Sequence, residues 1–302
     1  MEEPNPFLPD GRQFAWNHSS LEPAKACARK YHLSVHYECD DEGWWWGWTP
    51  KKYSDDLIFG SHYAKALERY HSAILRYSHD AALHEVIYLA LVESHGWESE
   101  SNNKNRETLL RSIIWYLDQH QDDPCQTVIL SDGQPAAELA FSFELDSEIV
   151  LCGHMDRIVS YSDELYVQDQ KTTGASIGSY YFKRYNPNDQ MSLYSIAAQV
   201  VWGAPVKGVM IDAAQIAVGF TRFERGFTFR TPAQTDKWLL DARYHIERTW
   251  EAEARGWPLN DAACMLYGGC PFIEICSRDP SVQREFLETN FVKRRASPLA
   301  VR

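Results

Sequence analysis

Between residues 54 and 120 the apolar positions repeat at intervals of three and four, which is the period of an amphipathic helix. Residues 54–80 show the repeat most clearly. The apolar residues that define it there are Tyr63, Leu67, Tyr70, Ile74 and Tyr77. The segments 81–97 and 104–120 carry the same pattern. We therefore predict three consecutive helices in this part of the chain.

The pattern changes after residue 125. Residues 126–173 alternate between apolar and polar and are rich in Val, Ile and Phe, and turn residues interrupt them. The turn signals are Asp132-Gly133, Asp146-Ser147 and Ser162-Asp163. This predicts a meander of about four strands. Beyond it we predict a helix ending at Gly203, more strand and a long helix, over residues 188–203, 206–230 and 231–256.

The first 53 residues carry no long periodic segment. We predict one short helix over residues 20–38, with Ser20 as its cap. The tryptophan-rich stretch 40–52 is predicted to be a loop because of its Gly and Pro residues. Taken together, the elements predict a single α/β or α+β domain over residues 1–302, with a central sheet flanked by helices.

Charged residues stand among apolar ones on two of the predicted strands. Asp156 lies in the first strand, and Asp169 and Lys171 lie in the second. Asp169 and Lys171 are two residues apart and share a face of the strand, whereas Gln170 points away. Two neighbouring carboxylates repel each other unless a cation lies between them. A hard divalent cation such as Mg²⁺ suits such oxygens, and the backbone carbonyl of Gln170 would add a third ligand. The alternative is a surface hairpin whose charges face water.

The composition allows an ordinary globular protein. The chain has 302 residues, 44% of them hydrophobic and 24% charged, and a net charge of −12. The net charge argues against a surface covered in non-specific nucleic-acid contacts but allows a local basic groove. No apolar run approaches the roughly 18 residues of a membrane span, and the acidic start does not resemble a signal peptide. We expect a cytosolic protein with no membrane partner.

The pattern G-x-x-D-R-I, L-x-V-x-D-x-K-T and Q-x-x-x-Y resembles the RecB-type nucleases of the PD-(D/E)XK superfamily, which include the CRISPR-associated exonuclease group and phage-encoded relatives. The resemblance implies a restriction-endonuclease-like core over about residues 54–256. It implies that Asp156 and Asp169 are the metal-binding acids, with Gln170 as a further ligand, and that Lys171 is the catalytic lysine. Gln190 and Tyr194 match the motif that contacts DNA and braces the site.

One position departs from this resemblance. The first helix of the family commonly reads F-G-S-x-x-H-K-A-L-E, with a histidine that helps to bind the metal, and here Ala64 stands at the histidine position. His62 lies about 200° away around the helix and is a poor substitute, whereas Glu68 lies one turn beyond Ala64 on the same face. Three alternatives stay open: a site that works without the histidine, a naturally weakened protein, or an introduced inactivating change.

Four of the seven cysteines form a second candidate site. Cys264, Cys270 and Cys276 are spaced C-x5-C-x5-C, and Cys27 lies far upstream. In several RecB-like nucleases one N-terminal and three C-terminal cysteines bind a 4Fe–4S cluster that joins the chain ends, and four thiolates suit such a cluster. The resemblance implies this arrangement here, formed by residues 20–53 and 257–276. A zinc site or unrelated buried cysteines are the alternatives.

The sequence therefore predicts a DNA nuclease that depends on Mg²⁺ or Mn²⁺. By resemblance it acts as an exonuclease on single strands or duplex ends, in a bacterial or phage-infected cell, with recombination or repair proteins as partners. The rival hypothesis is an inactive nuclease-fold protein that binds DNA or assembles recombination complexes, which Ala64 favours. We expect phosphate contacts from the basic segments 51–53, 182–185 and 292–295. The sequence does not indicate an oligomeric state.

Overall fold

The computed structural model describes residues 4–203, 205–266 and 269–299. The chain divides into two compact units. The first unit comprises Met1–Lys52, Ala140–Gly153 and Pro232–Arg302, and the second comprises Tyr53–Leu139 and His154–Thr231. Strands β5 (Ala137–Glu144) and β6 (Val150–Tyr161) contribute to both.

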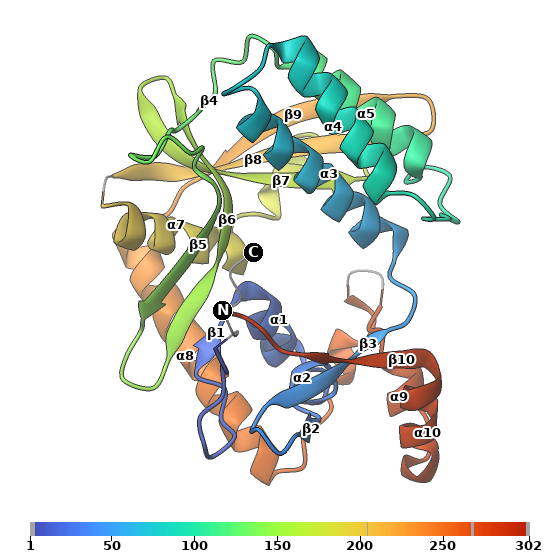
Figure 1. The fold of residues 1–302 in the computed structure, drawn as a ribbon. Coiled ribbons are helices and arrows are strands. Elements are labelled where there is room, and N and C mark those ends of the chain that lie inside the picture. Colours follow the sequence, from blue (N-terminus) through green and yellow to red (C-terminus); the bar gives the residue numbers. More distant parts are fainter. Residues whose placement is uncertain (1–3, 204, 267–268, 300–302) are drawn as a thin grey trace. The chain divides into compact units, whose positions relative to one another are not determined.

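The second unit is built on a mixed sheet (Figure 1). Its strands are β4 (Gln126–Thr127), β6, β7 (Glu164–Thr173), β8 (Val206–Ile216) and β9 (Thr221–Thr228). These five strands pair in that order, and among their pairs only β7–β8 is parallel. The four predicted strands of residues 126–173 are present, but they do not form a simple meander, because β4 and β5 both pair with β6. The further strand predicted over residues 206–230 is present as β8 and β9.

Three helices pack on one face of this sheet (Figure 1). They are α3 (Asp55–Ala73), α4 (His79–Glu93) and α5 (Arg106–Gln119), as the periodicity predicts. Each helix begins at a side chain that accepts a hydrogen bond from its first turn, and the caps are Ser54, Ser78 and Asn105. Their shared core includes Phe59, Leu67 and Ile113 together with Ala214 and Ile216 of β8.

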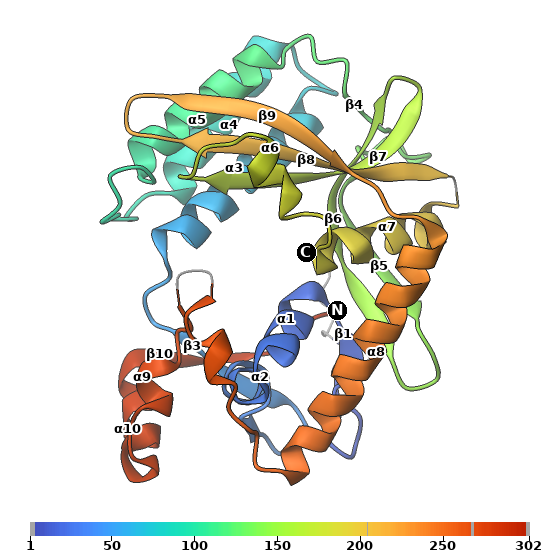
Figure 2. The same cartoon turned by 180° about the vertical axis from the view of Figure 1, so that it is seen from behind.

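The opposite face of the sheet carries α6 (Ser179–Lys183) and α7 (Asp189–Trp202), as Figure 2 shows. An added Cβ on Gly226 of β9 would come within 2.2 Å of the Phe182 ring, so glycine allows α6 to pack directly on the strand. Helix α7 begins at Asn188 and ends at Gly203, whose φ of 68° lies in the left-handed region. The predicted end of this helix is therefore confirmed.

Strands β6 and β7 form a tight hairpin. Ser162 and Asp163 connect them with φ values of 50° and 62°, which is the backbone of a type I′ turn. The pairing runs from Tyr161–Glu164 to Arg157–Gln168. The next positions outward are Asp156 and Asp169, so the two acidic residues lie where the hairpin ladder ends.

The first unit contains a small antiparallel sheet and several helices. The sheet order is β10 (Phe291–Arg295), β3 (Trp45–Pro50) and β2 (Glu38–Cys39). The short strand β1 (Ala15–Trp16) pairs in parallel with the first residues of β6 and thereby belongs to the mixed sheet. The helices are α1 (His18–Ala26), α2 (Ala28–Val35), α8 (Pro232–Ala254), a 3-10 turn (Asp261–Ala263), α9 (Ile273–Cys276) and α10 (Pro280–Asn290).

Two predictions for the first 53 residues were wrong. The stretch that was predicted to be a loop contains β3, because its tryptophans are paired with β10 and Trp48 is buried in the core of this unit. The predicted short helix is two helices with a break at Cys27. Its cap is Asn17 rather than Ser20, which instead completes the capping box from the third helical position.

Candidate active site

The centre of the candidate site is an ion pair on one face of β7. Asp169 is fully buried, with 0% of its surface exposed. Lys171 Nζ lies 2.8 Å from Asp169 Oδ1 and 2.7 Å from Oδ2, and 28% of the lysine side chain is exposed. The two side chains meet because alternate residues of a strand share a face. The lysine side chain thus extends from a buried carboxylate to solvent.

Asp156 brings a second carboxylate to the same place. Its Oδ2 accepts a hydrogen bond of 2.9 Å from the backbone N–H of Gln170, which ties the middle of β6 to β7 just beyond the paired residues of the hairpin. Burial raises the pKa of Asp169 to about 7, and the charge of Asp156 adds to this while Lys171 opposes it. The carboxylates are therefore close enough to repel each other, and Lys171 compensates only part of their charge.

Helix α7 supplies the next two candidate residues. Gln190 Nε2 donates a hydrogen bond of 3.0 Å to the Tyr194 hydroxyl, since the two residues lie one turn apart. Tyr194 is buried, and burial followed by the charges of Asp156 and Asp169 raises its pKa. Its phenol therefore stays protonated beside the carboxylates and can serve as a donor.

Three residues near this site were missed by sequence reasoning. Tyr181 of α6 and Tyr185, which lies just beyond the end of that helix, share a hydrogen bond of 3.0 Å between their hydroxyls. Burial raises the pKa of Tyr185, and the hydrogen bond from Tyr181 and the charge of Asp169 add to this. Glu138 of β5 has a φ of 47°, which is unusual for glutamate, and its charge contributes to the raised pKa of Tyr194. No motif marks these residues, because their neighbourhood arises only from folding.

The structure does not bring every predicted residue to the carboxylates. Helix α3 packs against β7 at Gly60, where an added Cβ would lie 3.6 Å from Thr172 Oγ1. Thr172 alternates with Lys171 and so faces the other side of the sheet. Within the described residues Ala64 and Glu68 make no hydrogen bond or ion pair with Asp156 or Asp169. His62 packs instead on the Trp97 ring, with 5.9 Å between ring centroids.

A buried polar network supports the hairpin from that other face. Gln168 Nε2 donates to Asp212 Oδ2 over 2.9 Å, and the Tyr116 hydroxyl donates to the same oxygen. Arg225 lies 3.3 Å from this carboxylate and makes a two-pronged contact with Asp123. The network thus holds the residue next to Asp169 in a fixed position.

The four candidate cluster cysteines lie together in the first unit. Cys27, Cys264, Cys270 and Cys276 line one small cavity with Lys30, Asn260 and Phe272. Burial raises the pKa of the Cys270 and Cys276 thiols, and the other cysteines add to the shift. The backbone N–H of Asn260 lies 3.3 Å from Cys27 Sγ and donates to it. The four cysteines that the sequence singled out therefore share one cavity, and one of their sulfur atoms accepts a backbone hydrogen bond.

In the described ranges no three His, Cys, Asp or Glu side chains are arranged to hold a single metal ion. The acidic groups beside Lys171 in the second unit are the carboxylates of Asp156 and Asp169. The same described residues include no helix with both the length and the apolar character needed to cross a membrane.

Comparisons with known proteins identify the family of the chain. The family model described as "PD-(D/E)XK nuclease superfamily" matches residues 15–277. A crystal structure of a protein from Eubacterium rectale called "Putative exonuclease" is similar at 9% sequence identity and a TM-score of 0.48, covering 82% of this chain and 86% of that one. No protein with curated functional information matches the sequence. Because the family model covers most of the chain and includes the strands with Asp156, Asp169 and Lys171, this protein belongs to the PD-(D/E)XK nuclease superfamily.

Proposed function

We propose that this protein hydrolyses phosphodiester bonds of DNA in a reaction that depends on Mg²⁺ or Mn²⁺. The observation that carries the proposal is the group of Asp156, Asp169 and Lys171 at the end of one hairpin. Two adjacent carboxylates with an incompletely compensated charge suit a hard divalent cation, and the Gln170 carbonyl is a further oxygen ligand. Such a cation, when bound, supplies an activated water and stabilises charge on the phosphate.

Lys171 is the residue that we assign to the chemistry. Its ammonium group is held by Asp169 and still reaches solvent, so it can approach a phosphate from the strand. There it would neutralise the negative charge that develops on the phosphate oxygens during hydrolysis. Asp169 keeps the lysine in place, because a buried carboxylate 2.7 Å away restricts the flexible side chain.

Gln190 and Tyr194 are assigned to positioning the substrate strand. The Gln190 amide donates one hydrogen bond to the Tyr194 hydroxyl, and an amide has a second N–H that can donate to phosphate or sugar oxygens. The raised pKa of Tyr194 keeps that donor protonated. Action on single strands or duplex ends, as an exonuclease in recombination or repair, is the form of this activity that we favour.

The proposal is tested by cleavage of end-labelled DNA. We expect linear single-stranded or duplex DNA to be shortened in Mg²⁺ or Mn²⁺ and to remain intact with a chelator. The position of the label that is released first separates exonuclease from endonuclease action. A protein that binds this DNA but leaves it intact in every divalent metal would instead be the inactive DNA-binding protein that Ala64 favours. Restored cleavage in Ala64→His would then identify the missing histidine as the reason.

We further propose that Cys27, Cys264, Cys270 and Cys276 bind a 4Fe–4S cluster. The shared cavity and the hydrogen bond from Asn260 to Cys27 support it. Protein prepared without oxygen is expected to be brown and to contain about four iron and four sulfide per chain, in line with four thiolate ligands. Cys276→Ser should lose most of both, whereas Cys39→Ser, which changes an exposed cysteine outside this cavity, should keep them. Colourless protein with zinc, or with no metal, would rule out the cluster.

A further inference from the structure

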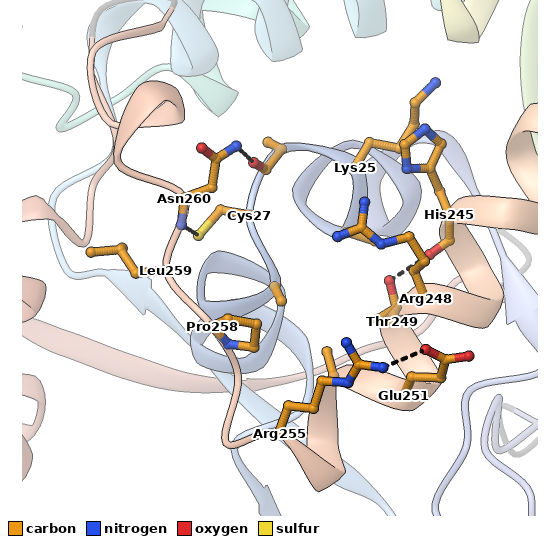
Figure 3. A pocket seen from close by; sticks show the side chains of 14 residues that line it. Lys25, Cys27, His245, Arg248, Thr249, Glu251, Arg255, Pro258, Leu259 and Asn260 are labelled. Carbon is orange, nitrogen blue, oxygen red and sulfur yellow. Dashed lines mark hydrogen bonds and ion pairs between the residues drawn. The ribbon is translucent and has the colours of Figure 1, made fainter.

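A second cavity in the first unit is lined by basic side chains. It has a volume of about 210 Å³ and lies between the end of α1, the start of α2 and one side of α8 (Figure 3). Lys25, His245, Arg248 and Arg255 line it, and Glu251 is its one acidic side chain among the described residues. In a chain whose net charge is −12, this is a local concentration of positive charge.

Arg248 carries the strongest part of the argument. Figure 3 shows its side chain extending from α8 toward the side of the cavity formed by Cys27 and Pro258. Its contacts are with Tyr244, whose ring centroid lies 5.6 Å from the guanidinium carbon and whose hydroxyl lies 3.5 Å from Nη1. A neutral phenol does not compensate the charge of a guanidinium. No ion pair of the described residues includes Arg248.

Arg255 adds a guanidinium that a ligand can recruit. It pairs with Glu251 at 3.3 Å, and 72% and 64% of the two side chains are exposed. An ion pair so exposed contributes little free energy, so a phosphate can replace the carboxylate at small cost. Arginine is suited to this exchange, because its planar donors match the oxygens of a phosphate.

The N-terminus of α2 adds partial positive charge to the cavity. Cys27 is the N-cap residue of this helix, and its side chain makes no hydrogen bond to the first-turn N–H groups. Cys27 Sγ instead accepts from the backbone N–H of Asn260, and Asn260 Nδ2 donates to Ala26 over 2.8 Å. Cys27 and Ala28 both line the cavity, so the partial positive charge of a helix start lies at its wall.

The basic segments that the sequence suggested for phosphate contacts are largely engaged within the protein. Lys51 Nζ donates to the backbone carbonyls of Glu288 and Thr289 at the end of α10. Lys293 pairs with Glu38, and Arg295 pairs with Asp40 at 3.2 Å. These cations of the first and third segments stabilise the first unit. In the segment 182–185, Arg184 lies over the Tyr181 ring, 4.7 Å from its centroid.

We propose that this cavity binds a phosphate group of the DNA backbone, through Arg248 and Arg255 with support from Lys25 and the start of α2. The inference rests on the proposed function, because it assigns an additional contact for the same substrate. Cavities for drug-sized ligands measure roughly 300 to 1,000 Å³, so this smaller one suits a single backbone phosphate with its sugar rather than a large cofactor. A contact of this kind holds DNA without reading its sequence.

The test measures equilibrium binding of a fluorescent oligothymidine in Ca²⁺ at several salt concentrations, so that cleavage is not required. Arg248→Ala is expected to weaken binding about tenfold, which corresponds to about 1.4 kcal/mol for one charge-assisted contact. The slope of log K against log salt should fall in magnitude by about 0.7. Arg255→Ala should act in the same direction. Circular dichroism and thermal melting would verify that these exposed replacements leave the fold intact.

Lys237→Ala is the matched control. Lys237 lies on the same helix and pairs with the exposed Asp241, but it does not line the cavity. Its replacement by alanine removes one positive charge, as Arg248→Ala does. It should leave both the affinity and the salt slope unchanged. If Arg248→Ala binds DNA as Lys237→Ala does, the proposal is overturned.

The ligand of this cavity could also be a small phosphate compound instead of the DNA backbone. Calorimetry with inorganic phosphate and with thymidine monophosphate distinguishes the two ligands. Tight binding of either compound that Arg248→Ala removes, with DNA affinity unchanged, would overturn the backbone assignment. If the protein never cleaves DNA but its DNA affinity depends on Arg248, the phosphate-binding proposal is supported and the proposed catalysis is contradicted. The two proposals can therefore fail separately.

Discussion

Lys171→Ala is expected to lower the rate constant of DNA cleavage by about 10²- to 10⁴-fold, the range for removing one group that stabilises a transition state. Lys171 is the cation that Asp169 holds at the end of the hairpin. The methyl group of alanine carries no charge, so it cannot neutralise the negative charge on the phosphate. Single-turnover cleavage of end-labelled DNA at saturating Mn²⁺ measures this directly, because it separates the chemical step from product release.

Lys207→Ala provides the comparison. Lys207 lies at the opposite end of the neighbouring strand and pairs with Glu164 in an exposed contact, so its loss should leave the rate within about twofold of the original. Asp169→Asn should reduce cleavage at least as strongly as Lys171→Ala, because it removes both a metal-binding carboxylate and the partner of the lysine. Cleavage by Lys171→Ala at the rate of the Lys207→Ala control would contradict the assignment of this lysine to catalysis.

Asp212→Ala is expected to destabilise the protein by about 3–5 kcal/mol, the usual cost of removing one member of a buried charged network. The side chain of Asp212 is 2% exposed and accepts hydrogen bonds from Gln168 and Tyr116. Its removal leaves Tyr116 without its acceptor, leaves Gln168 Nε2 with only the weakly accepting sulfur atoms of Cys125 and Met210, and deprives Arg225 of one of its two carboxylates. Urea unfolding followed by circular dichroism would measure the loss in the free energy of unfolding.

Two further variants identify the origin of that loss. Asp212→Asn keeps an oxygen acceptor but removes the charge, so it should cost less than Asp212→Ala if the hydrogen bonds dominate. Glu164→Ala breaks an exposed pair in the same unit and should change stability by less than about 1 kcal/mol. An Asp212→Ala protein as stable as the Glu164→Ala protein would show that the network does not support the hairpin.

Much of the second unit is predictable because its elements are local. Helices α3, α4 and α5 follow from the apolar repeat and from the polar residues that cap them. The β6–β7 hairpin follows from alternation and a turn signal, and the side-chain alternation of a strand places Asp169 beside Lys171. These features depend on residues that are near each other in sequence.

The errors concern residues whose partners are distant in sequence. Residues 46–50 form a strand because β10, more than 240 residues later, pairs with them. Glu138, Tyr181 and Tyr185 reach the neighbourhood of the carboxylates from separate elements, and no motif connects them. Arg248 and Arg255 belong to an amphipathic helix whose pattern does not distinguish a solvent-facing cation from one at a cavity.

The sequence alone therefore determined the order of helices and strands and the carboxylate–lysine group, because periodicity and alternation act over a few residues. Only the tertiary structure decided which distant side chains join that group, that the four cysteines share one cavity, and that basic residues of α1 and α8 meet at another. It also showed that α3 packs on the face of β7 opposite Lys171, so the place of Ala64 does not follow from its motif. The physical reason is that such contacts depend on how separate elements pack, and the free energy of packing is set by side chains far apart in the chain.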